Sequence, residues 1–513
     1  MKNTEKILAF DLGTGGIKAV LHDATGALLA TAYKAYPTYY PEIGWHEQAP
    51  ADWWDSLISC THDLLNKSGI AATSIVCLAL SGHSCGAVPI DDSGKLLREH
   101  TPIWSDMRAR EQSERFLNAV PMDDWYRITG GDMPGTYAVF KIMWYQDHEP
   151  EMMRHVFKIL GTKDYINYRL TGKIMTDRSY ASSSGVYDLR EGVYSKKLLA
   201  AAGVAVSILP EIFPSTAVVG KLTEEAAGLL HLSSSTRVIC GGVDNACMAL
   251  GSGGIENGRV YTNLGSSAWI AITTDVPLIN TKLYPNAFAH ILPNKYACAA
   301  TIFSAGNALR WVRDTLCPDL IAEAAAAGKD PYDLMMALAA TSPLGANRLI
   351  FNPTLAMGTL LDFSINTKGA FTGLDLRHTR ADLIRAAVEG ITLGLGWNFD
   401  ELKKLYPLSE RMLLVGGGSN SPFWMQVFAD IYGMPIITTT VGQNAGALGA
   451  AATAAVGAGI WDDFSHIDDI HIEDHVSLPV SANQSAYGKL MEIYQFVARC
   501  QGEIGDKLAE ATL

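Results

Sequence analysis

The sequence predicts an α/β protein built from two similar halves. Strand and helix signals alternate along all 513 residues, which is typical of α/β architectures. A glycine turn between two apolar runs occurs at residues 13–16, and a similar turn at 265–267 lies roughly half a chain away. Because a chain of this length exceeds what one hydrophobic core supports, we expect two lobes, residues 1–246 and 247–513, on either side of a cleft.

Composition and charge argue against several classes of protein. The formal net charge is −13, and Lys and Arg form no sizeable cluster, which argues against binding to nucleic acid or to a membrane surface. The chain starts without the apolar segment of a secretory signal, and no run of about 18 apolar residues follows, so we expect a cytoplasmic protein. The 8 cysteines form no Cys-x-x-Cys pair and the 13 histidines show no ligand spacing. Buried, reduced thiols are therefore expected, without a Cys or His metal site.

The first glycine turn is a candidate phosphate-binding element. It carries Gly13, Thr14, Gly15 and Gly16 between two strand-like runs. Small residues let backbone N–H groups approach a phosphate closely, and the Thr14 hydroxyl can add a donor. The order of residues is not that of a Walker A loop. Taken alone, such a segment is more often a plain hairpin turn.

The second turn and a third glycine cluster extend this interpretation. Gly265 and Ser266 repeat the first turn, and two such turns facing each other could grip the phosphates of a nucleotide from both sides. Glycines 416–418 end an apolar run, and a helix is expected to start near Ser421 or Pro422. Such a junction offers a flat backbone surface to a base or ribose, although a tight turn explains it equally well.

Asp244 is the first candidate for a catalytic base. It follows the apolar run 238–240 and two glycines, and it precedes the helix-like run 245–250. A side chain at this junction would enter a crevice at the carboxyl end of a strand. A carboxylate there can accept a proton from a substrate hydroxyl. The alternative is that Asp244 only caps the helix.

Several segments resemble the FGGY family of carbohydrate kinases. Residues 369–374, Asp382-Leu383 and 386–389 fit the spacing of the family's signature, and Thr379 is a suitable N-cap for a core helix there. The resemblance covers nearly the whole chain and implies an actin-like, ribonuclease-H-like duplicated fold with two lobes around a nucleotide cleft. Further segments that resemble the family are residues 44–54, 141–150, with departures at Ala138 and Tyr145, and 162–173.

The resemblance also implies roles for individual residues. It makes Asp244 the general base, Asn245 a sugar ligand and Asp11 the carboxylate on the Mg²⁺ side, acting through water. It makes ATP the phosphate donor. Arg310 is equally well explained as a surface cation on a helix. The positions that match phosphate-binding or nucleotide-binding residues of the family are Gly13, Thr14, Gly15, Lys18, Gly265, Ser266, Gly306, Arg310, Gly417, Gly418 and Ser421.

The sugar is less well specified. Ser84 and Cys85 stand where xylulokinases carry a Met and a His that contact the sugar. Asp106 and Arg108 are candidate partners of sugar hydroxyls, or they form a plain salt bridge. The resemblance implies a kinase of a ketopentose, with D-xylulose first. The alternatives are gluconate, ribulose, glycerol and a four-carbon sugar.

Two other classes of function stay open. One is an actin-like chaperone or assembly ATPase, although the chain offers no separate client-binding segment. The other is a non-catalytic sugar sensor, which the altered residues at 84 and 85 would suit, but which the presence of both Asp11 and Asp244 argues against. The sequence leaves the oligomeric state open, a homodimer included.

Overall fold

The computed structural model describes residues 4–356 and 363–511. The chain forms two compact units. The first comprises Met1–Asn257, Thr273–Cys298 and Asn444–His471, and the second comprises Gly258–Ile272, Ala299–Gln443 and Ile472–Leu513. The single division expected after residue 246 is simpler than this arrangement, because the chain passes between the units several times.

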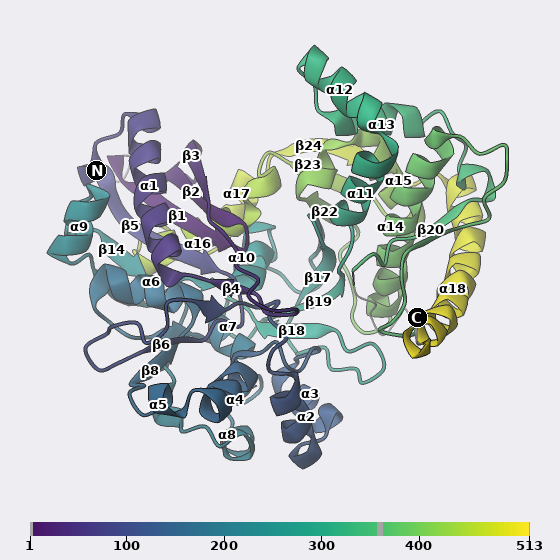
Figure 1. The fold of residues 1–513 in the computed structure, drawn as a ribbon. Helices are drawn as coiled ribbons and strands as arrows, with labels where there is room; N and C mark the ends of the chain where they lie inside the picture. The colour runs from purple at the N-terminus through teal and green to yellow at the C-terminus, as the bar shows by residue number, and fades with distance from the viewer. Residues whose placement is uncertain (1–3, 357–362, 512–513) are drawn as a thin grey trace. The chain divides into compact units, whose positions relative to one another are not determined.

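The first unit is built on a mixed sheet (Figure 1). In this sheet β1 runs antiparallel to β2 and parallel to β5, and Asp11 on β1 lies opposite Lys18 on β2. The first glycine turn therefore joins two antiparallel strands, as predicted. The order of the strands is β13 (Val218–Lys221), β14 (Arg237–Ile239), β5 (Ile75–Gly82), β1 (Lys6–Gly13), β2 (Gly16–Asp23) and β3 (Leu28–Ala35).

The second sheet repeats this topology. Its strand β16 runs antiparallel to β17 and parallel to β22, as β1 does to β2 and β5. The second glycine turn joins β16 to β17 in the same way that the first joins β1 to β2, so the predicted duplication is confirmed. The order is β18 (Asn286–Ala289), β19 (Tyr296–Ile302), β17 (Ala268–Thr274), β16 (Val260–Leu264), β22 (Met412–Val415), β23 (Ile436–Thr439) and β24 (Glu473–Ser477).

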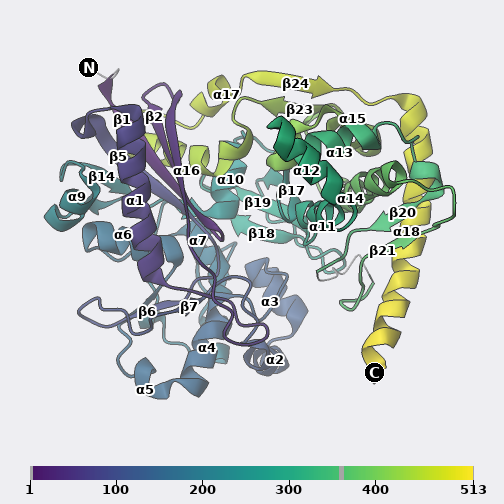
Figure 2. The same ribbon diagram turned by 45° about the horizontal axis from the view of Figure 1, so that its top comes forward.

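Helices cover both faces of the first sheet. Alternate residues of β1 point to opposite faces, so Phe10 joins a core with Trp53 of α1 (Pro50–Ser68), whereas Ala9 joins a core with Ala450 of α16 (Ala445–Gly457). Figure 2 shows α1 and α16 with this sheet. The helix α16 also packs on α10 (Asp244–Gly251). The chain thus returns to the first unit to complete its core.

The helix predicted from the family signature is α14 (Arg380–Lys403). Thr379 and Asp382 form the expected capping box at its start. Ala387, Ile391 and Leu395 of this helix are fully buried, so the helix is a core element of the second unit, as predicted. Within the residues that the structure describes, no helix is long and apolar enough to cross a membrane.

Candidate active site

Asp11 lies near the carboxyl end of β1 and is held on several sides. The hydroxyl of Ser81 on β5 donates to Asp11 Oδ1 at 2.8 Å. Burial raises the pKa of Asp11, while the Ser81 hydrogen bond and the positive charge of Lys18 oppose that rise. Lys18 Nζ also lies 3.5 Å from Asn444 Oδ1 at the start of α16. A carboxylate with a fixed orientation is therefore available beside the first glycine turn.

Gly446 leaves room at the other oxygen of Asp11. A Cβ atom at position 446 would lie 3.1 Å from Asp11 Oδ2, which is tighter than ordinary packing. The first turn of α16 approaches the carboxylate without displacing it because the residue there has no side chain. The space beside Oδ2 is thus a consequence of one glycine that is distant in sequence.

Asp244 is the first residue of α10. The turn before it needs glycine, because Gly241 has φ of +75° and a Cβ there would lie 2.1 Å from the carbonyl oxygen of Leu80. The N-cap residue of α10 is Val243, which makes no side-chain cap. Asp244 Oδ1 accepts one hydrogen bond, from the backbone N–H of Asn245 at 2.8 Å. The carboxylate therefore satisfies one N–H of the first turn and keeps further acceptor capacity.

The electrostatic setting of Asp244 suits a general base. Burial raises its pKa, the Asn245 N–H opposes the rise and the charge of Asp11 adds to it, which brings the pKa to about 7. A base is most effective when its pKa lies near the working pH. Carboxylates with such strongly raised pKa values cluster at functional sites. Asp11 and Asp244 thus form an interacting pair within the first unit.

The first glycine turn is fixed by side chains around it. Gln48 Nε2 donates to the Thr14 carbonyl at 2.7 Å, and the Tyr33 hydroxyl donates to the Gly15 carbonyl at 2.9 Å. Trp104 Nε1 donates to Thr14 Oγ1 at 2.8 Å. The Thr14 hydroxyl accepts this bond and keeps its own hydrogen for another acceptor. The turn is therefore rigid, and its hydroxyl can still donate.

In the second unit, the helix α11 (Gly306–Leu316) starts on the second glycine turn. The N–H of Gly306 donates to the Gly265 carbonyl at 2.9 Å, and the N–H of Asn307 donates to the Ser266 carbonyl at 3.0 Å. A Cβ at position 306 would lie 2.4 Å from the Gly265 carbonyl oxygen. Only glycine permits this approach. Gly265, Ser266 and Gly306 therefore lie together, whereas Arg310 is exposed further along the helix.

The third glycine cluster lies against the end of β16. A Cβ at Gly418 would lie 2.1 Å from Leu264 Cδ2, so this loop packs directly on the strand that leads into the second turn. Residues 417–420 form a short 3-10 helix, and Ser421 caps α15 (Pro422–Tyr432) by accepting from the Trp424 N–H at 3.3 Å. The structure thus gathers Gly417 and Gly418 with the second turn, while the hydroxyl of Ser421 is engaged as a helix cap.

Ser84 and Cys85, the residues that depart from the xylulokinase pattern, lie in a segment that is fixed by hydrogen bonds at Cys85. Cys85 has φ of +58°, and its N–H donates to Ser183 Oγ at 3.2 Å. Lys141 Nζ donates to the Cys85 carbonyl at 2.8 Å. Burial raises the pKa of the Cys85 thiol to about 11, Lys141 opposes this, and the charges of Asp244 and Asp132 add to it. Cys85 therefore lies within electrostatic reach of both carboxylates, and Ser84 beside it is partly buried.

Asp132 is a candidate site residue that sequence reasoning missed. Its Oδ1 accepts from Asn286 Nδ2 at 2.7 Å, and the same amide group donates to the Tyr137 hydroxyl at 3.1 Å. Burial raises the pKa of Asp132 to about 6. The loop around it carries no recognisable motif, and its partner Asn286 is 154 residues away along the chain. Only the fold reveals this carboxylate near Cys85.

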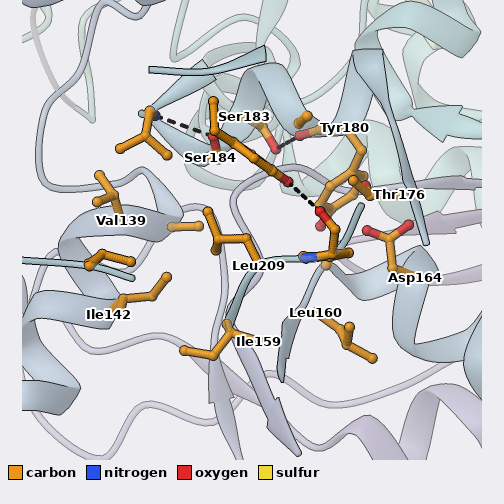
Figure 3. Close-up of a pocket in the computed structure, with 18 residues that line it drawn as sticks. Val139, Ile142, Ile159, Leu160, Asp164, Thr176, Tyr180, Ser183, Ser184 and Leu209 are labelled. Atoms are coloured by element: carbon orange, nitrogen blue, oxygen red, sulfur yellow. Dashed lines mark hydrogen bonds between the residues drawn. The ribbon is translucent and has the colours of Figure 1, made fainter. Parts of the chain in front are cut away.

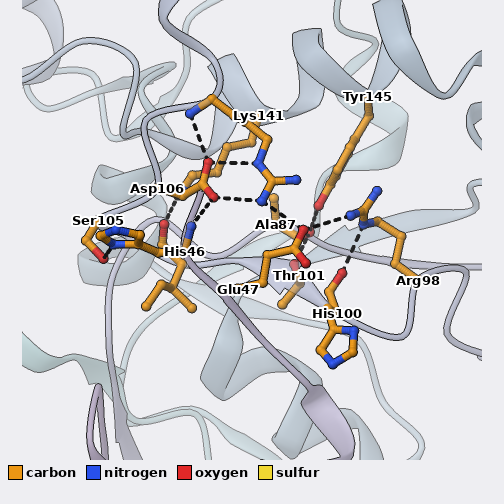
Figure 4. Close-up of polar contacts among 12 residues, drawn as sticks. His46, Glu47, Ala87, Arg98, His100, Thr101, Ser105, Asp106, Lys141 and Tyr145 are labelled. Atoms are coloured by element: carbon orange, nitrogen blue, oxygen red, sulfur yellow. Dashed lines mark hydrogen bonds and ion pairs between the residues drawn. The ribbon is translucent and has the colours of Figure 1, made fainter. Parts of the chain in front are cut away.

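Asp106 and Arg108 form a buried ion pair. Figure 4 shows Asp106 among its polar contacts. Arg108 Nε and Nη2 donate to the two oxygens of Asp106 at 2.9 and 2.7 Å, and both side chains are 0% exposed. Arg108 also pairs with Glu47 at 2.8 Å and stacks on Trp45, 3.9 Å from the ring centroid. Asp106 Oδ2 accepts a further bond from the His46 N–H at 2.7 Å. This geometry agrees with the salt-bridge interpretation of the pair.

An internal cavity of about 30 Å³ lies in the first unit (Figure 3). Its lining includes Val139, Ile159 and Asp164, but neither Asp11 nor Asp244. The volume suits one or two water molecules and is far too small for a sugar. This cavity is therefore not the substrate site.

Comparisons with known proteins agree over nearly the whole chain. Residues 6–251 match the N-terminal domain and residues 260–458 the C-terminal domain of the FGGY family of carbohydrate kinases. The xylulose kinase of Staphylococcus xylosus is 27% identical over 497 residues, which cover 96% of this chain and 99% of that protein.

Solved structures give the same result. The ligand-bound xylulose kinase and the gluconate kinase of Lactobacillus acidophilus each have a TM-score of 0.89 and 26% identity to this chain. Both alignments cover 98% of this chain, with 100% and 99% of the respective neighbours. The fold is thus the actin-like fold of sugar kinases, as predicted. The chain belongs to the FGGY family of carbohydrate kinases, enzymes that phosphorylate their substrates with ATP.

Proposed function

We propose that this kinase transfers the γ-phosphate of ATP to a hydroxyl of a ketopentose, with D-xylulose as the first candidate substrate. The proposal rests above all on the pair Asp11 and Asp244, in which the base has a pKa of about 7 and the second carboxylate has a fixed orientation. The full-length similarity to xylulose kinases supports the choice of sugar.

In the proposed reaction Asp244 orients the substrate hydroxyl and accepts its proton, while Asn245 helps to hold the sugar. Lys18, the Thr14 hydroxyl and the amides of the glycine turns would offset charge on the phosphates. The residues that would contact the nucleotide are Gly265, Ser266, Gly306, Gly417 and Gly418.

The residues around Asp11 fit a magnesium ion held mainly by water and phosphate oxygens. Oδ1 is oriented by Ser81 and Oδ2 has space beside Gly446. Within residues 4–356 and 363–511 no group of three or more His, Cys, Asp or Glu side chains could hold a metal. Mg²⁺ usually keeps several waters and needs only one or two carboxylates, so one anchoring aspartate suffices. When bound, Mg²⁺ would neutralise charge on the transferring phosphoryl group.

Asp132 is a candidate partner of the sugar. Asp132 and Asp244 both act on Cys85, and the positive charge of Lys141 opposes them there. The hydroxyls of a ketose can donate to the Asp132 carboxylate. We place Asp132 at the sugar as an orienting acceptor. Asp106 and Arg108, which bind each other, would have a structural role beside the sugar site.

The test is a coupled assay of ADP release with D-xylulose, ribulose, gluconate, glycerol and erythrulose. We expect the largest kcat/KM for a ketopentose. The Asp132→Asn variant should raise KM for the ketose about tenfold, the usual contribution of one charged hydrogen bond. Asp124→Asn, an exposed carboxylate in the same region, is the matched control. Equal kcat/KM for gluconate and ketoses would overturn the assignment of the sugar.

A cytoplasmic location remains a prediction. Fractionation of cells that carry the tagged chain tests it directly, with the soluble cytoplasmic fraction as the expected result and a membrane or secreted fraction as the contrary one.

A further inference from the structure

Asp177 is a fully buried carboxylate that the proposed reaction does not use. It is the N-cap residue of α7 (Arg178–Ala181), where its side chain accepts from the Ser179 N–H at 2.9 Å and the Tyr180 N–H at 3.3 Å. Two hydroxyls also donate to it, Ser179 Oγ at 2.5 Å and Ser215 Oγ at 2.7 Å. A helix cap requires only the backbone bonds. The two hydroxyl bonds therefore go beyond capping.

A buried lysine fixes Asp177 in place. Lys163 on α6 (Thr162–Thr171) is 0% exposed, and its Nζ lies 3.0 Å from Asp177 Oδ1 and 2.5 Å from Asp164 Oδ1. Burial alone would lower the pKa of Lys163, but the negative charges of its two carboxylate partners outweigh burial and raise this pKa. Buried charges are tolerated when they are paired and hydrogen-bonded in this way. The ion pair thus anchors Asp177 to the start of α6.

The hydroxyl of Ser179 connects Asp177 to the segment that carries the proposed base. Ser179 Oγ donates its hydrogen to Asp177 Oδ2 and accepts the N–H of Val243 at 3.0 Å. Val243 is the N-cap residue of α10 and directly precedes Asp244. Gly242 permits this approach, because a Cβ atom there would lie 2.9 Å from Ser179 Oγ. Since Asp177 takes the hydrogen of this hydroxyl, the lone pairs of Ser179 Oγ are left for Val243.

The Ser179 bond fixes the proposed base relative to Asp11. In the sheet of the first unit, Gly242 of β15 (Gly242–Val243) lies opposite Ser81, which itself lies opposite Asp11 on β1. Because β15 is only two residues long, its pairing with β5 provides few hydrogen bonds. The Ser179 hydroxyl supplies the bond to the last N–H before the base. A displacement of about 1 Å at a reacting group can reduce turnover about a hundredfold, so this bond bears on the rate.

We propose that Ser179 and Asp177 are positioning residues for the Asp244 base, with Lys163 as the anchor of Asp177. This inference rests on the proposed function of Asp244 as general base. Together the three residues hold the start of α10, so that the carboxylate of Asp244 meets the substrate hydroxyl in the orientation that proton transfer needs. Because Ser179 and Asp177 are 0% exposed, they act through Asp244 and not on a substrate directly.

Ser179→Ala tests the proposal, and Ser215→Ala is its matched control. Both variants remove one buried hydroxyl that donates to Asp177 Oδ2, but of the two hydroxyls only that of Ser179 also holds the Val243 N–H. We expect kcat to fall at least about tenfold for Ser179→Ala, with ATP and the ketopentose that gives the largest kcat/KM in the substrate panel. KM for both substrates should stay within about twofold of wild type, and so should kcat of Ser215→Ala. Ser179→Thr, which keeps the hydroxyl, should restore most of kcat.

A double variant separates positioning of the base from a general weakening of the fold. If Ser179 acts through Asp244, Ser179→Ala should have almost no further effect on kcat in the Asp244→Asn background. A loss of about tenfold in both backgrounds would show that the two residues act independently, and would overturn the proposal.

Hydrogen exchange measures the bond itself and needs no substrate. The Val243 amide should exchange about tenfold faster in Ser179→Ala than in wild type or Ser215→Ala, as mass spectrometry of peptides covering residues 240–248 would show. Equal exchange in the two alanine variants, or equal kcat, would overturn the inference while leaving Asp244 as the base. Undiminished turnover of Asp244→Asn would instead overturn the proposed function, and this inference with it.

Discussion

Replacing Asp244 by Asn removes one carboxylate while keeping the size of the side chain and its place at the start of α10. A positioned base contributes a factor of about 10²–10⁴ to kcat, so the variant should lose about 3–5.5 kcal/mol of transition-state stabilisation. The pH profile should change as well. With a pKa of about 7, Asp244 in the wild type makes kcat/KM rise with pH up to about 7 and level off above it. The variant should lack this acidic limb.

The same substitution should stabilise the fold at high pH. The folded pKa of Asp244 is raised from its ordinary value of 3.8 to about 7, so the folded chain keeps a proton that the unfolded chain releases in this window. Protonated Asp244 therefore makes its full contribution to the stability of the wild type below pH 4. This contribution is lost as the pH rises to about 7. The full shift corresponds to about 4 kcal/mol, and partial exposure reduces it to on the order of 1–2 kcal/mol. Urea unfolding should find the variant more stable than wild type at pH 8 and equal to it at pH 4.

Glu389→Gln is the control for burial of a carboxylate. Glu389 accepts from Arg385 Nε at 2.7 Å, from the Tyr487 hydroxyl at 2.8 Å and from the Gly345 N–H at 3.1 Å, all within the second unit. Loss of the Glu389 carboxylate should lower the free energy of unfolding by about 3–5 kcal/mol, with turnover of the folded enzyme unchanged.

Undiminished turnover of Asp244→Asn in a steady-state assay with saturating ATP would refute the catalytic role of Asp244.

Three further substitutions probe the surroundings of the site. Ser81→Ala removes the donor to Asp11, so the Mg²⁺ concentration for half-maximal rate should rise about tenfold; an unchanged metal dependence would contradict the proposed role of Asp11. Gly446→Ala places a methyl group 3.1 Å from Asp11 Oδ2, so the metal dependence should worsen although alanine favours a helix by about 1 kcal/mol; a melting temperature that falls together with activity would point to simple misfolding. Asp106→Ala leaves the buried charge of Arg108 with Glu47 as its remaining carboxylate partner, and denaturant unfolding should show a loss of about 3–5 kcal/mol; a loss under 1 kcal/mol would contradict the structural role of the pair.

Local patterns made much of the fold predictable. The glycine turn after Leu12 lies between two short apolar runs, which is typical of a hairpin, and β1 and β2 are joined there as expected. Thr379 and Asp382 predicted the start of α14, because a capping box depends only on residues three apart. The return of α16 to the first unit was not predictable, since its apolar sequence gives no indication of which core it completes.

The candidate site was predictable only in part. Asp244 stands out because it follows a strand-like run and a glycine turn, and Asp11 was expected from the resemblance to the FGGY family. The residues that set the surroundings of these carboxylates do not stand out in the sequence. Ser81 is 70 residues from Asp11, and Gly446 acts only by having no side chain. Asp106 and Arg108 were proposed as sugar ligands or as a salt bridge, and their complete burial could be seen only in three dimensions.

The central claim, phosphoryl transfer from ATP to a ketopentose, is tested most directly by ³¹P NMR of the purified protein with Mg²⁺, ATP and D-xylulose. The claim predicts a sugar monophosphate signal that grows in equal amount with ADP and is absent for Asp244→Asn. ADP and free phosphate without a sugar phosphate, for every ketopentose offered, would contradict it.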